Sequence, residues 1–387
     1  MLHYGLPCTA DCTRRPFSSP GPSASLLVVS LAVRSLPALR RYPSAVALPF
    51  RIQPVSPVPT SREIRLASRP DGLPTAANFE LATVDIGAPG EGQVLVRNLI
   101  MSVDPYMRGR MNDVKSYVPP FELDAAMQGD AIGEVIESHA AGFAVGDIVQ
   151  SFFGWREYYL ADASMLRKVD PAVQPRSEWL GVLGVTGFTA WAGLQLVEVK
   201  AGDRVFISGA AGGVGTVAGQ LAKQRGCTVI GSAGTAEKVE MLTQQLGYDA
   251  AFNYRDGNLY RQLMTASPKG IDVYFDNVGG EHLEAAISAL RPFGRVAACG
   301  SISGYNEPTP GPRNMAMIIG KRLTIKGFIV SDFEAQRAEF MAEVGPLLAS
   351  GALQSRETSV QGIENAPDAF LGLFTGGNIG KMLVTLA

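Results

Sequence analysis

The sequence predicts an α/β fold with two parts, a mostly β domain followed by a doubly wound parallel sheet. From Glu63 to about Trp179, short strand-like runs are broken by Gly, Pro and Asp turns. After Gly181, strands alternate with amphipathic helical patterns of roughly 10–15 residues, which is typical of βαβ units. The chain has 387 residues, a length that favours two domains over one.

The strands of both parts are short apolar runs that end at turn residues. In the mostly β part we expect them at residues 93–100, 133–136 and 147–153. In the parallel sheet we expect strands at residues 204–208, 228–230, 271–275, 294–298 and 323–330, with helices at 239–246 and 283–290. Residues 380–386 form a last strand, after a helical pattern that starts near Ala335.

The composition is that of a globular protein. Hydrophobic residues make up 46% of the chain and charged residues 18%, which excludes a charge-rich disordered chain. Lys and Arg number 34 against 36 Asp and Glu, so there is no basic excess to attract nucleic acid. No apolar run is long enough to span a bilayer, and no membrane partner is expected.

Cysteine and histidine are too few and too scattered for a disulfide framework or a zinc site. They are Cys8, Cys12, Cys227, Cys299, His3, His139 and His282. We therefore predict no metal and a reducing, cytoplasmic location.

Residues 1–62 are predicted to be a disordered extension, with the fold starting near Ile64. The first sixty residues hold ten prolines, eight serines and six arginines but one acidic residue, Asp11. Arg14 and Arg15 before the apolar run Leu26–Val33 are typical of a targeting segment, although further arginines crowd the end of that run. A targeting segment therefore stays open beside the favoured alternatives, an unstructured extension or an upstream start site.

The strongest local signal is a glycine loop between the strand ending at Ser208 and the next helix. Small residues there let a dinucleotide pyrophosphate approach the backbone, and the helix N-terminus supplies unpaired N–H groups. The loop residues expected at the phosphates are Gly212, Gly213, Val214 and Gly215. Ala210 replaces the first glycine of the usual G-x-G-x-x-G pattern, and a tight turn without a ligand is the alternative.

The residues after the second parallel strand indicate which dinucleotide is bound. An NAD site has an acid there for the ribose 2′-hydroxyl, whereas an NADP site lacks it and has a cation nearby. Residues 231–235 contain no acid, and Lys238 follows shortly afterwards. The sequence therefore predicts NADPH, with a merely solvated Lys238 as the alternative.

Several motifs, in order, resemble one known family. They are residues 103–110 (VDPYMRGR), 181–190 (GVLGVTGFTA), the glycine loop, 275–280 (FDNVGG) and 299–306 (CGSISGYN). From about residue 62 onward the chain is similar to the zinc-independent medium-chain dehydrogenase/reductases, in the branch of prostaglandin, 2-alkenal and curcumin reductases. The resemblance implies a GroES-like catalytic domain (63–183 and 341–387) around a Rossmann NADP-binding domain (184–340).

The resemblance also implies an activity, namely NADPH-dependent reduction of carbon–carbon double bonds conjugated to a carbonyl, and a homodimer is possible. Gly212, Gly213 and Gly215 would face the pyrophosphate, and Lys238 and Tyr254 the adenosine 2′-phosphate. The residues that would line the nicotinamide half are Asn277, Cys299, Ser301, Ser303, Tyr305, Phe328, Ile329, Val330 and Asn378.

Without a metal, hydrogen-bond donors must stabilise the enolate that forms when hydride reaches the β-carbon. Tyr305 and Tyr106 are the candidates, with the cofactor ribose hydroxyl as an alternative donor and a purely space-filling role as the alternative for each tyrosine. Substrates are expected to be small, hydrophobic enals and enones. An NADPH-dependent quinone reductase and a non-catalytic NADPH-binding redox sensor remain alternative functions.

Other residues of the motifs have two interpretations each. Met107, Phe328 and Trp155 would supply apolar walls for the substrate or belong to the core, and the core is favoured. Arg108 and Arg110 would steer phosphates or pair with nearby carboxylates, and pairing is favoured. The expected carboxylate partners are Asp104 and Asp113.

Overall fold

The structure is a computed structural model, and it describes residues 60–386. The predicted extension therefore lies outside the described residues, except for its last three. Strand β1 (Thr60–Leu66) begins four residues before Ile64, so residues 60–62 belong to a strand and not to the extension. Their backbone pairs with β2 (Phe79–Asp85) in an antiparallel hairpin, which accounts for the earlier start.

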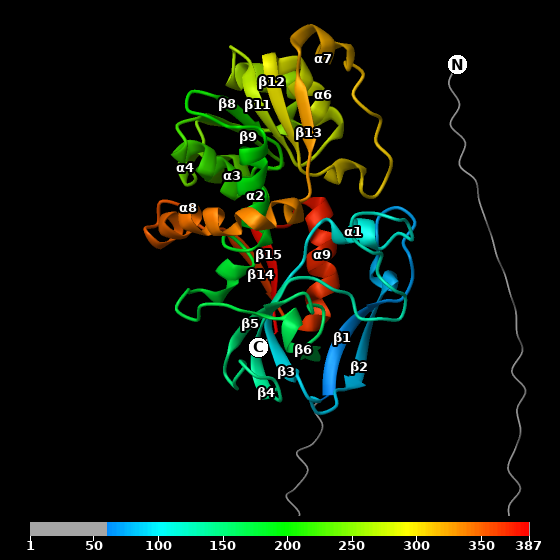
Figure 1. The fold of residues 1–387 in the computed structure, drawn as a ribbon. Coiled ribbons are helices and arrows are strands. Elements are labelled where there is room, and N and C mark those ends of the chain that lie inside the picture. Colours follow the sequence, from blue (N-terminus) through cyan, green and yellow to red (C-terminus); the bar gives the residue numbers. More distant parts are fainter. Residues whose placement is uncertain (1–59, 387) are drawn as a thin grey trace, which may run out of the picture. The chain divides into compact units, whose positions relative to one another are not determined.

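The first part of the chain and its last strands share one mixed sheet of seven strands (Figure 1). Its order is β14-β15-β3-β4-β5-β7, with β6 paired to β3. The bounds are β3 Gln93–Ser102, β4 Ala131–Ser138, β5 Ile148–Ser151, β6 Tyr158–Asp162, β7 Arg167–Lys168, β14 Glu357–Gln361 and β15 Lys381–Thr385. Because β15 pairs with β3, the end of the chain completes a domain that its beginning started.

The middle of the chain forms a six-stranded parallel sheet with the order β10-β9-β8-β11-β12-β13 (Figure 1). The bounds are β8 Arg204–Ile207, β9 Thr228–Ala233, β10 Ala250–Asn253, β11 Ile271–Asp276, β12 Leu290–Ala298 and β13 Thr324–Gly327. The strand order reverses between β8 and β11, and ligands of such sheets bind at the carboxyl ends beside the reversal. The predicted fold class is confirmed.

Nine α-helices connect these strands within residues 60–386. They are α1 Met107–Arg110, α2 Val185–Leu196, α3 Gly213–Gln224, α4 Ala236–Gln244, α5 Leu259–Ala266, α6 Gly280–Ala289, α7 Ala316–Lys321, α8 Arg337–Ala349 and α9 Ala366–Thr375. Within that range, no helix has the length and apolar character needed to cross a membrane.

The largest apolar core includes residues of both sheets, and the mixed-sheet domain has a further core of its own. Phe188 and Trp191 of α2 are fully buried and pack against Phe340 of α8, with ring centroids 5.0 and 6.2 Å from it. In the mixed-sheet domain, Met107 and Trp155 are both 0% exposed, and Trp155 packs edge-on against Phe370. Met107 and Trp155 are thus core residues and not walls of a substrate pocket.

The glycine loop is tied directly to the last strand. The Gly380 N–H donates to the carbonyl oxygen of Ala211 over 2.8 Å, and Gly212 pairs with Gly380 as a parallel bridge. Gly380 has φ +66°, and a Cβ there would lie 1.9 Å from the Arg356 carbonyl oxygen. Only glycine fits this contact, which fixes the loop relative to the mixed sheet.

Candidate active site

The glycine loop has the geometry that an anion-binding turn requires. Gly212 is the extended N-cap of α3, and no side chain caps that helix. A Cβ on Gly215 would lie 2.5 Å from the Gly209 carbonyl oxygen and 2.7 Å from the Ala210 Cα, so the helix packs tightly against the turn. The first-turn N–H groups of α3, at Gly213, Val214 and Gly215, are therefore free of side-chain caps, which suits a pyrophosphate.

Basic and aromatic side chains gather where β9 ends. A Cβ on Gly234 would lie 3.2 Å from the Tyr254 hydroxyl and 3.5 Å from Arg255 Nε. Arg255 also lowers the pKa of Lys238, after burial as the larger cause, so the two cations are neighbours. Tyr254 and Arg255 thus lie against a glycine at the position where an acid would select NAD, and Lys238 is a neighbour of Arg255.

Sequence reasoning missed Arg255. The residue follows Tyr254 directly and comes after β10, a four-residue strand that the pattern did not reveal. The available signal in the sequence was a basic residue directly after Tyr254. In the structure its guanidinium carbon lies 5.7 Å from the centroid of the Tyr254 ring. In this structure Lys238 Nζ donates to the Gly376 carbonyl oxygen at the end of α9, over 2.7 Å.

The loops after β11 and β12 bring most of the predicted nicotinamide residues together. Asn277 Nδ2 donates to the Ser208 carbonyl oxygen over 2.8 Å, which places Asn277 beside the glycine loop. Ser303 Oγ donates to the Val278 carbonyl oxygen over 2.6 Å, and the Ser301 N–H donates to the Tyr305 hydroxyl over 3.4 Å. These contacts fold the loop 300–305 against the residues that follow β11.

Cys299 lies at the base of this loop, and its N–H donates to the Asp276 carbonyl oxygen over 2.9 Å. Burial raises the pKa of the Cys299 thiol to about 12, with Asp276 as a smaller cause. The side chain is therefore a neutral thiol at physiological pH, and it supplies packing and not a nucleophile.

Phe328, Ile329, Val330 and Asn378 lie on two other segments. The predicted strand 323–330 is shorter, because β13 ends at Gly327, and a 3₁₀ helix begins at Val330. The Phe328 ring turns toward α2, since it would lie 2.9 Å from a Cβ on Gly193. Asn378 Nδ2 donates to the Gly380 carbonyl oxygen over 2.7 Å, which puts Asn378 next to the bridge with the glycine loop.

The two candidate donors come from different domains and share a neighbour. Tyr117, on the loop after α1, raises the pKa of Tyr106 and of Tyr305 as a minor cause in each case. Burial is the main cause of the raised pKa of both phenols. Tyr106 and Tyr305 are therefore neutral O–H donors at physiological pH. Tyr117, which is 62% exposed, was not predicted, because nothing in the sequence marks that loop.

The expected pairing of Arg108 and Arg110 with Asp104 and Asp113 is wrong. Arg108 donates to the side chains of Asn306 and Asn112 and to the Gly72 carbonyl oxygen. Asp104 instead forms an ion pair with Lys381, and Asp113 lies 4.0 Å from Arg69. The strand pairing explains this, because β15 places Lys381 opposite the end of β3, where Asp104 follows.

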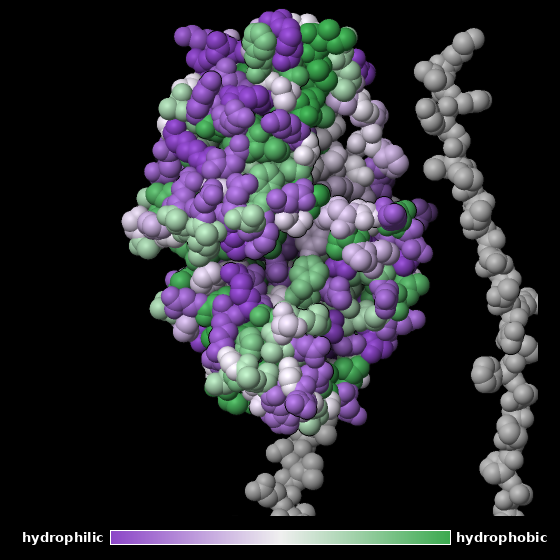
Figure 2. Space-filling model, viewed as in Figure 1, coloured by the Kyte–Doolittle hydropathy of each residue, from purple (hydrophilic) through white to green (hydrophobic). Residues whose placement is uncertain are grey.

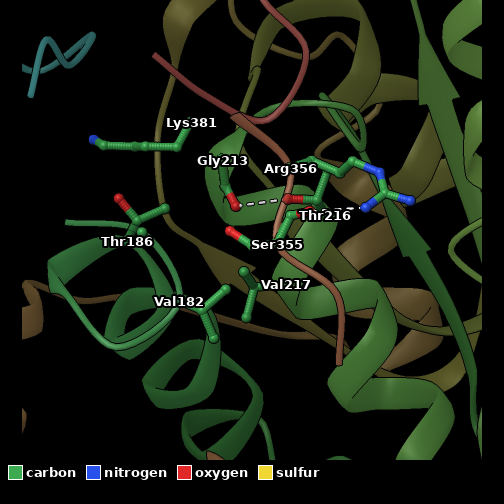
Figure 3. A pocket seen from close by; sticks show the side chains of 9 residues that line it. Val182, Thr186, Gly213, Thr216, Val217, Ser355, Arg356 and Lys381 are labelled. Carbon is green, nitrogen blue, oxygen red and sulfur yellow. Dashed lines mark hydrogen bonds between the residues drawn. The ribbon is translucent and has the colours of Figure 1, made fainter. Parts of the chain in front are cut away.

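A small cavity of about 10 Å³ lies at the base of the glycine loop (Figure 3). It has room for about one water. Val182 and Val217 point into it, whereas the side chain of Lys381 runs away from it, with Nζ at the far end (Figure 3). The other lining residues are Gly181, Thr186, Gly213, Thr216, Ser355 and Arg356.

A larger cavity of about 430 Å³ lies against β14 and α9, and none of the predicted site residues lines it. In the orientation of Figure 1, the surface in Figure 2 is hollowed near its middle, at the height of α1 and the upper end of α9. Because Tyr106 directly precedes α1, we place the candidate substrate site at this hollow and not at the larger cavity.

Comparison with known proteins identifies the family. Residues 62–169 match the family model described as "N-terminal domain of oxidoreductase", and residues 213–348 match the one described as "Zinc-binding dehydrogenase". The NADPH-dependent curcumin reductase of Escherichia coli is 40% identical over 83% of this chain and 96% of its own length. Prostaglandin reductase 1 of mouse is 41% identical over 81% of this chain and 95% of its own.

Solved structures of related proteins have the same fold. The crystal structure of CurA in complex with NADPH from Vibrio vulnificus superposes with a TM-score of 0.81 and 41% identity, over 84% of this chain and 99% of that one. Two domains of this kind, with a dinucleotide loop at the strand reversal, define a nicotinamide-dependent oxidoreductase. The chain belongs to the medium-chain dehydrogenase/reductases, in the zinc-independent branch of curcumin, 2-alkenal and prostaglandin reductases.

The name of the second family model mentions zinc, but residues 60–386 bring together no group of three or more His, Cys, Asp and Glu side chains that suits a metal ion. Of the cysteines in that range, Cys227 is buried at the start of the second parallel strand, away from Cys299 at the end of β12.

Proposed function

We propose that this protein reduces the carbon–carbon double bond of α,β-unsaturated aldehydes and ketones with NADPH. The observation that carries the proposal is that two neutral phenols, Tyr106 and Tyr305, lie on segments of different domains that the hydrogen bond from Arg108 Nε to Asn306 Oδ1 joins over 3.1 Å. The relatives named as curcumin, 2-alkenal and prostaglandin reductases support this substrate class.

The residues present fit NADPH. A Cβ on Gly213 would lie 3.0 Å from Thr186 Cγ2 and one on Gly215 2.5 Å from the Gly209 carbonyl oxygen, so glycine is needed for α3 to start this close to the turn. The uncapped N-terminus of α3 would hold the pyrophosphate, and Lys238, Tyr254 and Arg255 the 2′-phosphate. Asn277, Ser301, Ser303 and Asn378 supply polar groups for the nicotinamide half, and Phe328, Ile329 and Val330 its apolar side.

NADPH would supply the hydride for the β-carbon. The side chains of the protein would stabilise the negative charge that then builds on the carbonyl oxygen of the substrate. Tyr106 or Tyr305 donates its O–H to that oxygen, because both phenols keep their proton at physiological pH. Burial of both side chains strengthens such a hydrogen bond by lowering the local dielectric. Solvent then protonates the α-carbon.

The test mixes the purified full-length protein with NADPH and a panel of enals, enones and quinones and follows cofactor oxidation and products. We expect a saturated carbonyl product with enals or enones. Turnover of quinones alone would replace the proposal with a quinone reductase. NADPH binding without turnover of any member, and without effect of Tyr106→Phe or Tyr305→Phe, would indicate a redox sensor instead.

We further propose a homodimer through the edge of the parallel sheet. Strand β13 is an edge strand, and all four of its residues are exposed. Two apolar side chains are exposed in this region: Ile319 of α7 is 81% exposed, and Ile325 of β13, six residues later, is 37% exposed. Unpaired strand edges with apolar side chains favour pairing with a second chain. Analytical ultracentrifugation, with Ile325→Lys as the disrupting variant, tests this.

The free thiols of Cys227 and Cys299 support a reducing, cytoplasmic compartment as the place of action, which we also propose. Imaging of the full-length chain in cells, with residues 1–59 retained, tests the location.

A further inference from the structure

Arg110 is a buried cation without a carboxylate partner among residues 60–386. The side chain is 5% exposed, and none of the ion pairs in that range includes it. Nε donates to the Pro119 carbonyl oxygen over 2.8 Å, and Nη2 donates to Gln128 Oε1 over 2.9 Å. Nη1 is enclosed and has no hydrogen-bond partner among the described residues. A buried charge in this state lowers the stability of the fold, so its retention calls for a functional explanation.

The guanidinium is held rigidly. Its central carbon lies 4.1 Å from the ring centroid of Phe121 and 5.6 Å from that of Phe152. The Phe121 N–H also donates to the Arg110 carbonyl oxygen over 2.7 Å. Two hydrogen bonds and two aromatic rings thus fix the orientation of the group before any ligand binds.

Tyr106 is the neighbour toward which this charge acts. Tyr106 is the N-cap of α1 and Arg110 is the last residue of that helix, so the two stand four positions apart on one helical turn. Burial lowers the pKa of Arg110, and Tyr106 is the next cause and acts to raise it; burial likewise raises the pKa of the Tyr106 phenol, and Arg110 acts to lower it. The carboxylates Asp104 and Asp130 act on Tyr106 in the opposite direction.

We propose that Arg110 is a positioning residue for Tyr106: its fixed guanidinium, one helical turn from that tyrosine, polarises the phenol, so that the Tyr106 O–H points at the substrate carbonyl. This inference rests on the proposed function and adds a residue to it. The guanidinium does not touch the substrate, because Nη1 is enclosed. Its fixed positive charge stabilises the phenol as it donates to an oxygen that gains negative charge.

The test is a double-mutant cycle on kcat with an enone that the wild-type protein reduces. Arg110→Met is expected to lower kcat by about tenfold while the dissociation constant of NADPH changes less than about twofold. In the Tyr106→Phe background the same substitution is expected to change kcat by less than about twofold. Arg110→Lys keeps the charge and should recover part of the loss. Equal losses in both backgrounds would overturn the inference, because a purely structural role is additive.

Arg108→Met is the matched control. Arg108 is 3% exposed and, like Arg110, donates to a backbone carbonyl oxygen, that of Gly72. Its other two partners are the side chains of Asn306 and Asn112, so all of its hydrogen bonds go to residues other than Tyr106. Its effect on kcat should be the same in the Tyr106 and the Tyr106→Phe backgrounds.

A second measurement does not depend on turnover. In protein labelled with ¹³C at tyrosine Cζ, the Tyr106 signal is assigned by its loss in Tyr106→Phe. Arg110→Met should shift that signal, and Arg108→Met should not. An unmoved Tyr106 signal would overturn the inference even if no enone were reduced, whereas a shifted signal with no enone turnover would retain the pair and reject the proposed function.

Discussion

Lys381, the first residue of β15, forms a buried ion pair with Asp104, two residues before Tyr106. The side chain of Lys381 is 5% exposed and that of Asp104 is 21% exposed. The Asp104 carboxylate also accepts from the Ser102 hydroxyl. Since the residue before Lys381 holds the glycine loop, this pair connects the loop to the segment that carries Tyr106.

Lys381→Met should therefore be strongly destabilising. Removal of one partner leaves the Asp104 charge half-buried and unpaired, and such losses amount to about 3–5 kcal/mol. Chemical denaturation measures the change in the free energy of unfolding. Lys168→Met is the control, because Lys168 is 47% exposed in its pair with Asp147 and should cost less than about 1 kcal/mol. Similar losses for the two variants would contradict the role of burial.

Gly215→Ala should abolish NADPH binding and destabilise the fold. The added Cβ would meet backbone atoms of Gly209 and Ala210 at 2.5–2.7 Å, and backbone cannot move aside as a flexible side chain can. We expect a loss of about 1–3 kcal/mol together with the loss of binding by calorimetry. A Cβ on Gly372 in α9 would meet nothing within 4 Å, so Gly372→Ala should be neutral or stabilising. Retained binding in Gly215→Ala would refute the close approach of helix and turn.

Lys238→Ala and Arg255→Ala should each weaken NADPH binding about tenfold or more, with the affinity for NADH little changed. The reason is the loss of a charge-assisted contact to the 2′-phosphate, which NADH lacks. Titration by fluorescence gives both dissociation constants. The exposed Lys269 serves as control, and Lys269→Ala should alter neither. Equal losses for NADPH and NADH would show that the two cations do not contact the phosphate.

The stability of the fold should fall as pH rises, because of a buried pair of glutamates. Burial, then Glu357, raises the pKa of Glu178 to about 7, and the pKa of Glu357 is raised as well. Glu178 Oε2 and Glu357 Oε1 are both enclosed and have no hydrogen-bond partner among residues 60–386. Folding therefore favours the protonated form, and the stability present below the ordinary glutamate pKa is lost as pH approaches 7.

Glu178→Gln removes this proton dependence. The variant should gain about 1–2 kcal/mol over wild type at pH 8 and differ little at pH 5. Thermal unfolding at both pH values measures the difference, and the Tm of Glu134→Gln, at an exposed ion pair with Arg97, provides the baseline. An equal gain at both pH values would mean that the carboxyl pair does not titrate in this range.

The sequence predicted the parts of the fold whose patterns are strongly periodic. The glycine loop, the second parallel strand and the two-part architecture follow from local residue order. Helix α2 was identified only as a motif, since eight of its twelve residues are buried and it shows no polar face. Strand β10 and helix α5 were missed, because four residues of strand before a polar turn give little periodic signal.

The place of a residue in the fold could be predicted where it follows a strand closely, whereas its contacts could not be predicted where long-range packing decides them. Asn277 and Ser301 come just after β11 and β12, so strand positions were sufficient to place them. The partners of Arg110, by contrast, lie on a loop without regular structure between α1 and β4, at Pro119, Phe121 and Gln128. No spacing rule brings those residues together, and the mistaken pairing with carboxylates came from sequence proximity alone.

The place of β15 in the mixed sheet makes two separate properties depend on one strand. This strand is inserted between β14 and β3, and its preceding glycine holds the nucleotide loop. A variant that lacks residues 380–385 can assemble the parallel sheet, but its mixed sheet stays open between β14 and β3. Such a variant should fail to take up coenzyme and should be a target for chaperones or proteases.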